Sequence, residues 1–332
     1  DASGDSIWVQ DFNKTYYENL ISGNGVRYQF SRQDGSPVNE DLTGRSVNTY
    51  YQDMSGGTYR LTADVVGWIK VPHSIWWYGA DQCPGRNSTN AGLALDAGAI
   101  PNAGSPDTLV ADAIAVVKQA LPSFNWAQYD ADKDGVIDHL WIIYAGHGQS
   151  ASDTLLNRTD YGEAAIWPHS GAVTPAHQVV SGVSAGPYLM IPEDTGLATL
   201  VHEFGHGLGA DDLYAIDPTY YSGNTSAGFW TIMSDSWVGV PITSLPSAMD
   251  PWHLDYWGWL NPLVITDPAR EYTVTLRQAS ASHSVPGSYK GVKILLPDGQ
   301  SDLPVKPAGG GRQWWGGQKG EANSQMTLSS PL

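Results

Sequence analysis

The chain has 332 residues, which is room for one large domain and a smaller neighbour. Its 34 acidic residues outnumber 17 basic ones, and the formal net charge of −17 argues against binding to nucleic acid or to anionic membranes. A single cysteine, Cys83, excludes an internal disulfide, and no apolar run reaches the roughly 18 residues of a membrane helix, so we expect no membrane insertion and a chain stabilised by its core and by bound cations.

The chain before residue 130 predicts a mixture of strands and helices. We expect a strand over Tyr59–Val65 and a helix over Asp107–Leu121. Both precede a strongly acidic segment, to which the helix connects directly.

The acidic segment Asp130–Asp138 has the spacing of a calcium loop. Carboxylates occupy positions one, three, five and nine, a glycine occupies position six and an apolar residue position eight. Position twelve is Trp141 instead of glutamate, and Leu140–Tyr144 predicts a buried strand, so we expect a calcium loop that leads into a strand and no EF-hand. An acidic, solvated turn is the alternative, although so many carboxylates repel one another unless a cation neutralises them. The expected calcium ligands are Asp130, Asp132, Asp134, Val136 and Asp138.

Two histidines downstream stand in polar or glycine-rich surroundings. His147 lies between two glycines, and His169 follows a Trp-Pro pair. Either could lie at the edge of a site. The sequence offers no partner for them, however, and a hydrogen-bonded structural histidine is the simpler interpretation of each.

The segment His202–Asp212 contains H-E-x-x-H followed by x-x-G-x-x-D. On a helix, His202 and His206 lie on the same face, so both imidazoles can reach one metal ion. Glu203 is then placed to take a proton from a zinc-bound water. A chance spacing of two histidines on a helix is the alternative, and the added glycine and aspartate disfavour it.

The residues around the motif predict an active-site helix and its end. Glu193–Thr195 offers capping side chains, and apolar residues recur from Leu197 at steps of three and four. Gly209 is suited to a left-handed conformation that ends the helix. A turn there could bring Asp212 to the metal as third ligand, and the adjacent Asp211 is the rival.

Beyond the helix, Gly228–Ser234 places Met233 in an apolar segment followed by a Ser-Asp-Ser turn. This pattern fits a Met-turn, in which a methionine forms the floor beneath the histidines of a zinc site. A core methionine that fills a gap is the alternative.

The aromatic residues and the tail favour packing. The chain has 14 tryptophans, and we expect Trp76, Trp77 and the group in Trp252–Trp259 to pack the core instead of lining a cleft.

After Pro262 the pattern predicts strands over Tyr272–Leu276 and Val292–Leu296. We expect two regions: a catalytic domain over residues 1–265 and a β-rich C-terminal region over 266–332 that begins a further domain.

These residues resemble the immune inhibitor A family of secreted bacterial metallopeptidases, and the resemblance runs in order over most of the chain. It rests on the acidic loop together with the segments Asn48–Gly57, Gly67–Pro72, Tyr78–Asp81, Tyr144–Gln149, Ile166–His169, His202–Tyr214, Trp230–Met233 and Trp257–Leu260. The resemblance implies a metzincin-like α+β fold with zinc bound by His202, His206 and Asp212, Glu203 as general base, and proteins or peptides as substrates.

The chain departs from the family pattern at two positions. Asp211 stands where a proline is expected, and Ala215 stands where an aspartate is expected. Asp211 could compete for the metal, or bind calcium together with Asp217.

The sequence therefore predicts a secreted zinc endopeptidase that binds Zn²⁺ and Ca²⁺, with a monomer as the simplest oligomeric state. Residues Asp1–Asp5 do not form a signal peptide, and we expect the chain to begin inside a longer precursor. A calcium-stabilised binding or adhesion module without activity is one alternative. A zinc hydrolase of non-peptide amides or esters is the other.

Overall fold

The computed structural model describes residues 12–31, 37–79, 104–146, 148, 166–180, 182–193, 195–214, 227–234, 245–267, 270–278, 286–295, 313–316 and 323–328. These belong to two compact units, one comprising residues 1–46, 63–211 and 237–246, and the other 47–62, 212–236 and 247–332. Among the residues discussed above, Asp1–Asp5, Cys83, His147, Ala215 and Asp217 lie outside the described ranges.

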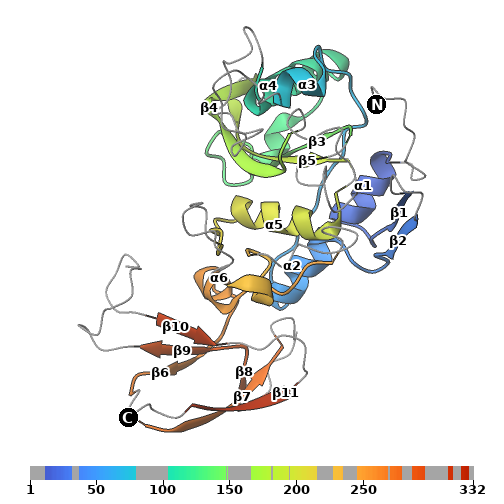
Figure 1. The fold of residues 1–332 in the computed structure, drawn as a ribbon. Coiled ribbons are helices and arrows are strands. Elements are labelled where there is room, and N and C mark those ends of the chain that lie inside the picture. Colours follow the sequence, from blue (N-terminus) through green and yellow to red (C-terminus); the bar gives the residue numbers. More distant parts are fainter. Residues whose placement is uncertain are drawn as a thin grey trace, which may run out of the picture. The chain divides into compact units, whose positions relative to one another are not determined.

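The first unit contains the sheet and the helix that carry the candidate site (Figure 1). Its elements in chain order are α1 (Lys14–Ile21), β1 (Arg27–Ser31), β2 (Pro37–Asp41), α3 (Ile75–Gly79), α4 (Pro106–Ala120), η3 (Trp126–Tyr129), β3 (Leu140–Tyr144), β4 (His169–Val180), β5 (Val183–Pro192) and α5 (Leu197–Gly207). The expected helix near residue 107 is therefore confirmed as α4. The expected strand after the acidic loop is confirmed as β3, but it is not the buried strand predicted, since Tyr144 is buried and its other residues are half-buried.

The sheet of this unit has the order β3-β5-β4, with β5 in the centre. β3 runs parallel to β5, and β4 runs antiparallel to it. Figure 1 shows α4 and α5 on opposite sides of this sheet, and α4 packs against β4 while α5 packs against β4 and β5. Because helices cover both faces, β5 is buried at eight of its ten positions. A short connection then leads from β5 into α5.

Helix α4 forms because its first residues cap it well and one of its faces packs into the core. Ser105 caps it by accepting from the Thr108 amide at 3.2 Å, and Pro106 occupies the first turn, where a missing N–H costs nothing. Its buried face includes Val110 and Ile114, which join the main core beneath the sheet. This core positions the strand that precedes the candidate site.

The second unit is rich in strands. It contains α2 (Val47–Ser55), η7 (Gly228–Trp230), α6 (Pro251–Tyr256), β6 (Leu263–Ile265), β7 (Tyr272–Arg277), β8 (Ser288–Tyr289), β9 (Val292–Leu295), β10 (Gln313–Gly316) and β11 (Asn323–Leu328). The strands form two sheets, β10-β9-β6 and β11-β7-β8, around a core of Ile265, Val274, Leu276 and Val292. The predicted strands at β7 and β9 are confirmed, and β10 forms in a glycine-rich stretch where the sequence predicted no element.

One sequence prediction is wrong. Residues Tyr59–Val65 form no strand. The Tyr59 amide donates to Ser55 Oγ at 3.0 Å and the Leu61 amide donates to Asn48 Oδ1 at 2.9 Å, so side chains of α2 take the donors that a strand would use. The alternating pattern was overridden by these local bonds.

The tryptophans near α6 pack as expected. The ring centroids of Trp257 and Trp259 lie 4.8 Å apart, and each lies 6.2 Å from the ring of the fully buried Tyr51. Edge-on contacts of this kind stabilise a core beyond the area they bury. Trp252, in contrast, is 37% exposed.

Candidate metal centre

Helix α5 is held in place by its apolar packing. Its N-cap is Gly196, so neither Glu193 nor Thr195 is the N-cap residue, and Asp194 lies outside the described residues. The Glu193 carboxylate instead accepts from the Gly146 amide at 2.6 Å. Every residue from Leu197 to Gly205 is buried, and in proteins such tertiary packing supplies most of a helix's stability.

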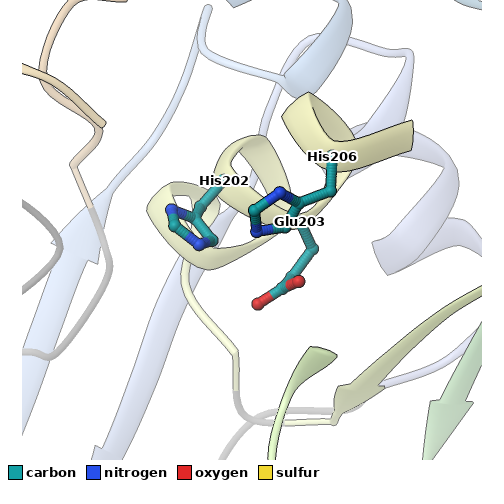
Figure 2. Close-up of side chains that lie close together, drawn as sticks. All are labelled: His202, Glu203 and His206. Carbon is teal, nitrogen blue, oxygen red and sulfur yellow. The ribbon is translucent and has the colours of Figure 1, made fainter. Parts of the chain in front are cut away.

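The helix brings the three motif side chains together. Metal-binding atoms of His202, Glu203 and His206 all lie within 4.8 Å of one another. Figure 2 shows the two imidazoles and the carboxylate leaving the same stretch of α5. His202 and Glu203 are each 6% exposed. Buried side chains on a packed helix have few alternative rotamers, so this group is pre-positioned.

The end of α5 fixes the orientation of His206. Gly209 has a φ of +85°, as its predicted helix-ending role requires. The Gly209 amide donates to the His206 carbonyl and the Ala210 amide to the Gly205 carbonyl, both at 2.9 Å, which is the Schellman pattern. The Ala210 carbonyl then accepts from Nδ1 of His206 at 2.8 Å.

That bond selects one imidazole tautomer. A carbonyl oxygen can only accept, so Nδ1 of His206 carries the hydrogen and Nε2 keeps a lone pair for a metal ion. A zinc ion fits this group, which consists of two imidazoles beside a carboxylate. The imidazole of His206 is already oriented by a carbonyl. The role of the Ala210 carbonyl could not be predicted from the sequence, because every residue has a backbone carbonyl and the residue type does not show where it points.

The two candidates for the third metal ligand lie where the sequence passes from the first unit to the second. Asp211 is exposed and ends the first unit, whereas Asp212 begins the second. The choice between them stays a prediction.

The predicted Met-turn has the expected local structure. Met233 is fully buried in the turn Thr231–Ser234, and its amide donates to Thr231 Oγ1 at 3.2 Å. The Leu213 amide donates to the Met233 carbonyl at 2.7 Å, so this turn pairs with the segment that directly follows Asp212. Its role as the floor of a metal site remains a prediction.

The acidic loop gathers three of the predicted calcium ligands. Carboxylate oxygens of Asp130, Asp132 and Asp134 lie within 4.8 Å of one another. Asp138 does not belong to this group; its Oδ2 accepts from the Ala131 amide at 2.8 Å. Val136 forms an isolated bridge with Ser184 beside the sheet.

The loop is shaped by bonds from its carboxylates to its own backbone. Asp130 Oδ2 accepts from the Gly135 amide at 3.1 Å, and Asp134 Oδ1 from the Val136 amide at 2.7 Å. Lys133 and Gly135 have φ values of +63° and +88°, so the chain turns sharply here. Asp130 Oδ1 is buried and accepts no hydrogen bond from the residues that the structure describes. A buried, unsatisfied carboxylate oxygen is a suitable ligand for a cation.

The strand after this loop contacts the site helix. The rings of His139 and Trp141 lie 4.8 Å and 5.4 Å from the ring of Phe204. Phe204 is fully buried and directly follows Glu203 on α5. Burial lowers the pKa of His139, although the neighbouring Asp138 opposes that shift.

His169, for which the sequence offered no partner, has two hydrogen-bond partners in the structure. Its Nδ1 lies 2.7 Å from the Trp167 carbonyl and its Nε2 lies 3.2 Å from the Tyr188 hydroxyl. Tyr188 in turn donates to Asp107 Oδ1 at 2.7 Å. These residues come from β4, β5 and α4, so only the folded sheet brings them together.

An α+β domain in which a buried helix carries H-E-x-x-H defines a metallopeptidase domain. Residues 1–260 match the family described as "Immune inhibitor A peptidase M6, catalytic domain". The chain belongs to this family.

Known proteins agree with this assignment. The chain is 28% identical to "Immune inhibitor A" of Bacillus thuringiensis subsp. alesti over 98% of its own length and 47% of that protein. It is 28% identical to "Pre-pro-metalloprotease PrtV" of Vibrio cholerae serotype O1 over 86% of its own length and 32% of that protein. The chain thus spans half or less of the length of these relatives.

Proposed function

We propose that this chain is a zinc-dependent endopeptidase that hydrolyses peptide bonds within proteins. The single observation that carries the proposal is the group of His202, Glu203 and His206 on one packed helix, in which His202 and Glu203 are buried and His206 is half-buried. Membership of a metallopeptidase family implies a metal, and imidazole ligands suit zinc.

Each motif residue has a separate role in this proposal. His202 and His206 hold the ion, with Asp212 as third ligand. A zinc ion bound there supplies a Lewis acid and a water whose pKa lies near neutrality. Glu203 takes a proton from the attacking water and then passes it to the amine that leaves. Because the carboxylate is buried beside the imidazoles, it is within reach of both steps.

A second cation belongs to the proposal. We infer that the acidic loop binds Ca²⁺ through Asp130, Asp132, Asp134, the Val136 backbone and Asp138. The clustered carboxylates and the buried Asp130 Oδ1 support this inference. Since the loop leads into β3, and β3 contacts Phe204 of α5, bound calcium would stabilise the support of the metal helix.

We also propose a domain organisation and a location for the protein. Residues 1–265 are the catalytic domain and residues 266–332 start a β-rich region. The protein acts outside the cell as a monomer on protein or peptide substrates, in keeping with a relative whose name is "Pre-pro-metalloprotease PrtV". Within the described residues, no helix has the length and apolar character needed to cross a membrane.

Digestion of casein tests the proposal. The zinc-loaded chain should produce internal cuts, identified by mass spectrometry. A chelator should stop cleavage, and Zn²⁺ should restore it where Ca²⁺ alone does not. Cleavage that survives the chelator, or that Ca²⁺ alone restores, would remove the role of zinc. Trimming confined to chain ends would exclude an endopeptidase.

A further inference from the structure

A buried carboxylate, that of Asp250, begins helix α6 in the second unit. Its Oδ1 accepts from the His253 amide at 3.0 Å, which is an N-cap bond. Its Oδ2 accepts from Nδ1 of His253 and from the Thr231 hydroxyl, each at 2.7 Å. Three donors from the described residues thus converge on one carboxylate. Only the first of these bonds belongs to the cap, so capping alone does not account for the arrangement.

The Asp250 carboxylate is ionised and can therefore only accept hydrogen bonds. Burial raises the pKa of Asp250, but the hydrogen bonds and charge of His253, together with the Thr231 hydroxyl, outweigh that effect and hold the pKa below its usual value. A buried charge of this kind contributes little net stability, because its removal from water offsets most of what its partners return. Buried polar groups can instead select one arrangement of the chain among several.

The Thr231 hydroxyl connects this carboxylate to the predicted Met-turn. Since its hydrogen goes to the carboxylate, its lone pairs are left for other donors, and the Met233 amide donates to it at 3.2 Å. The Ile232 amide donates to the Ala248 carbonyl, also at 3.2 Å. Every residue of Thr231–Ser234 is fully buried. Side-chain and backbone bonds thus fix the turn together.

The same turn holds the residue that follows Asp212. The Leu213 amide donates to the Met233 carbonyl at 2.7 Å, and the Leu213 carbonyl accepts from the Ala227 amide at 3.1 Å. Both backbone groups of Leu213 are therefore bonded to the segment that contains the turn. All of these residues belong to the second unit. A continuous series of contacts leads from the Asp250 carboxylate to the backbone next to Asp212.

We propose that Asp250 is a positioning residue for the third zinc ligand. Through Thr231 it holds the Met-turn in one conformation, and the Met-turn holds the backbone beside Asp212. His253 fixes the carboxylate against α6 with its two donors. This role rests on the proposed function in one respect, which is that Asp212 binds the zinc ion.

Zinc affinity, measured by competition with a chelator of known affinity, tests this role. Thr231→Val keeps the shape of the side chain and removes the hydroxyl that joins Asp250 to Met233. It should weaken zinc binding by about tenfold, the lower end for a residue that supports a metal ligand. Thr231→Ser keeps a hydroxyl and should bind zinc like the parent. Asp250→Asn keeps a capping side chain but loses an acceptor oxygen, and should show the same loss as Thr231→Val.

A matched control lies on the same helix. Asp255 forms an ion pair with Lys293 at 2.8 Å. Asp255→Asn makes the same chemical change in α6 and breaks this pair, so it should lower the melting temperature slightly and leave zinc affinity unchanged. Parental zinc affinity in Thr231→Val and Asp250→Asn, with only the melting temperature lowered, would make Asp250 a structural cap and overturn the proposal. An equal loss of zinc affinity in Asp255→Asn would overturn it as well.

The Co²⁺-loaded chain gives a second readout that does not depend on activity. The visible absorption of Co²⁺ depends on the geometry of its ligands. Thr231→Val and Asp250→Asn should therefore change the spectrum, whereas Thr231→Ser and Asp255→Asn should leave it as in the parent. A parental spectrum in both of the first two variants would contradict a positioning role.

The Asp212→Ala background shows whether the effect passes through Asp212. If it does, Thr231→Val should add no further loss of zinc affinity in that background. An undiminished further loss would mean that the turn acts by another route, and would overturn the proposal. Full zinc binding in Asp212→Ala would instead count against the ligand assignment in the proposed function. A chain that keeps these zinc effects but cleaves no peptide would count against the peptidase function and leave the role of Asp250 standing.

Discussion

Helix α5 and the acidic loop Asp130–Asp138 both gather side chains that suit a cation, but they hold them in different ways. On α5 two of the three side chains are buried, and the group is positioned by apolar packing and by the Ala210 carbonyl. In the loop, Asp132 and Asp134 are exposed and the carboxylates bond to their own backbone. The difference teaches that the helix keeps its arrangement through the core, whereas in the loop a bound cation would offset the repulsion between carboxylates. Loss of zinc should therefore cost activity, and loss of calcium should cost stability.

Among the variants that compare the two cation sites, the largest expected effect concerns the third zinc ligand. Asp212→Ala should lose zinc and reduce activity by more than about a hundredfold, the upper end for losing a supporting residue, because two histidines hold the ion poorly. Asp211→Ala, the matched control, should keep most of both. Zinc content is measured by metal analysis. Full zinc in Asp212→Ala with loss in Asp211→Ala reverses the assignment, and full zinc in both places the third ligand elsewhere.

The next largest expected effect is on the thermal stability of the chain and concerns the acidic loop. Asp132→Ala and Asp134→Ala should each lower the melting temperature in calcium by several degrees, since a ligand at a hundred times its Kd adds about 2.7 kcal/mol to the folded state. In chelator the difference from the parent should nearly vanish. Glu271→Ala, which removes an exposed acidic residue outside the loop, should show no calcium dependence. A parent chain whose melting ignores calcium would make the loop an acidic turn.

The smallest expected effect comes from a change at the end of α5 that alters both the helix geometry and zinc binding. Gly209→Ala places a side chain in the left-handed region and should cost about 1 to 2 kcal/mol. It should also weaken zinc binding, because it disturbs the Ala210 carbonyl that orients His206. Gly258 has a φ of +72° after α6 and serves as a control with similar strain. Gly258→Ala should destabilise its own unit with zinc affinity unchanged. Equal zinc affinity in the two variants would remove the orienting role of Ala210.

Much of the local structure could be predicted because it depends on neighbouring residues. The face shared by His202 and His206, the left-handed Gly209 and the strand after the acidic loop all follow from local periodicity and conformational preference. The N-cap position of α5 differs from the prediction, because Gly196 occupies it and the Glu193 carboxylate accepts a hydrogen bond from the Gly146 amide. The strand expected at Tyr59–Val65 failed because Asn48 and Ser55 took its donors.

The long-range network could not be predicted at all. Asp107, His169 and Tyr188 come from three elements, and their residue types are common in sequences without such contacts. Their contact depends on the antiparallel register of β4 with β5 and on the packing of α4 against that sheet. Neither can be read from spacing along the chain.

The central claim is that Glu203 acts as the proton acceptor in a site whose metal is held by other side chains. The most direct test is Glu203→Gln, which is nearly the same in shape and cannot take up the proton. We predict full zinc content, an unchanged melting temperature and a loss of kcat by several orders of magnitude. A variant that keeps its zinc and cleaves peptides within about tenfold of the parent would contradict the account.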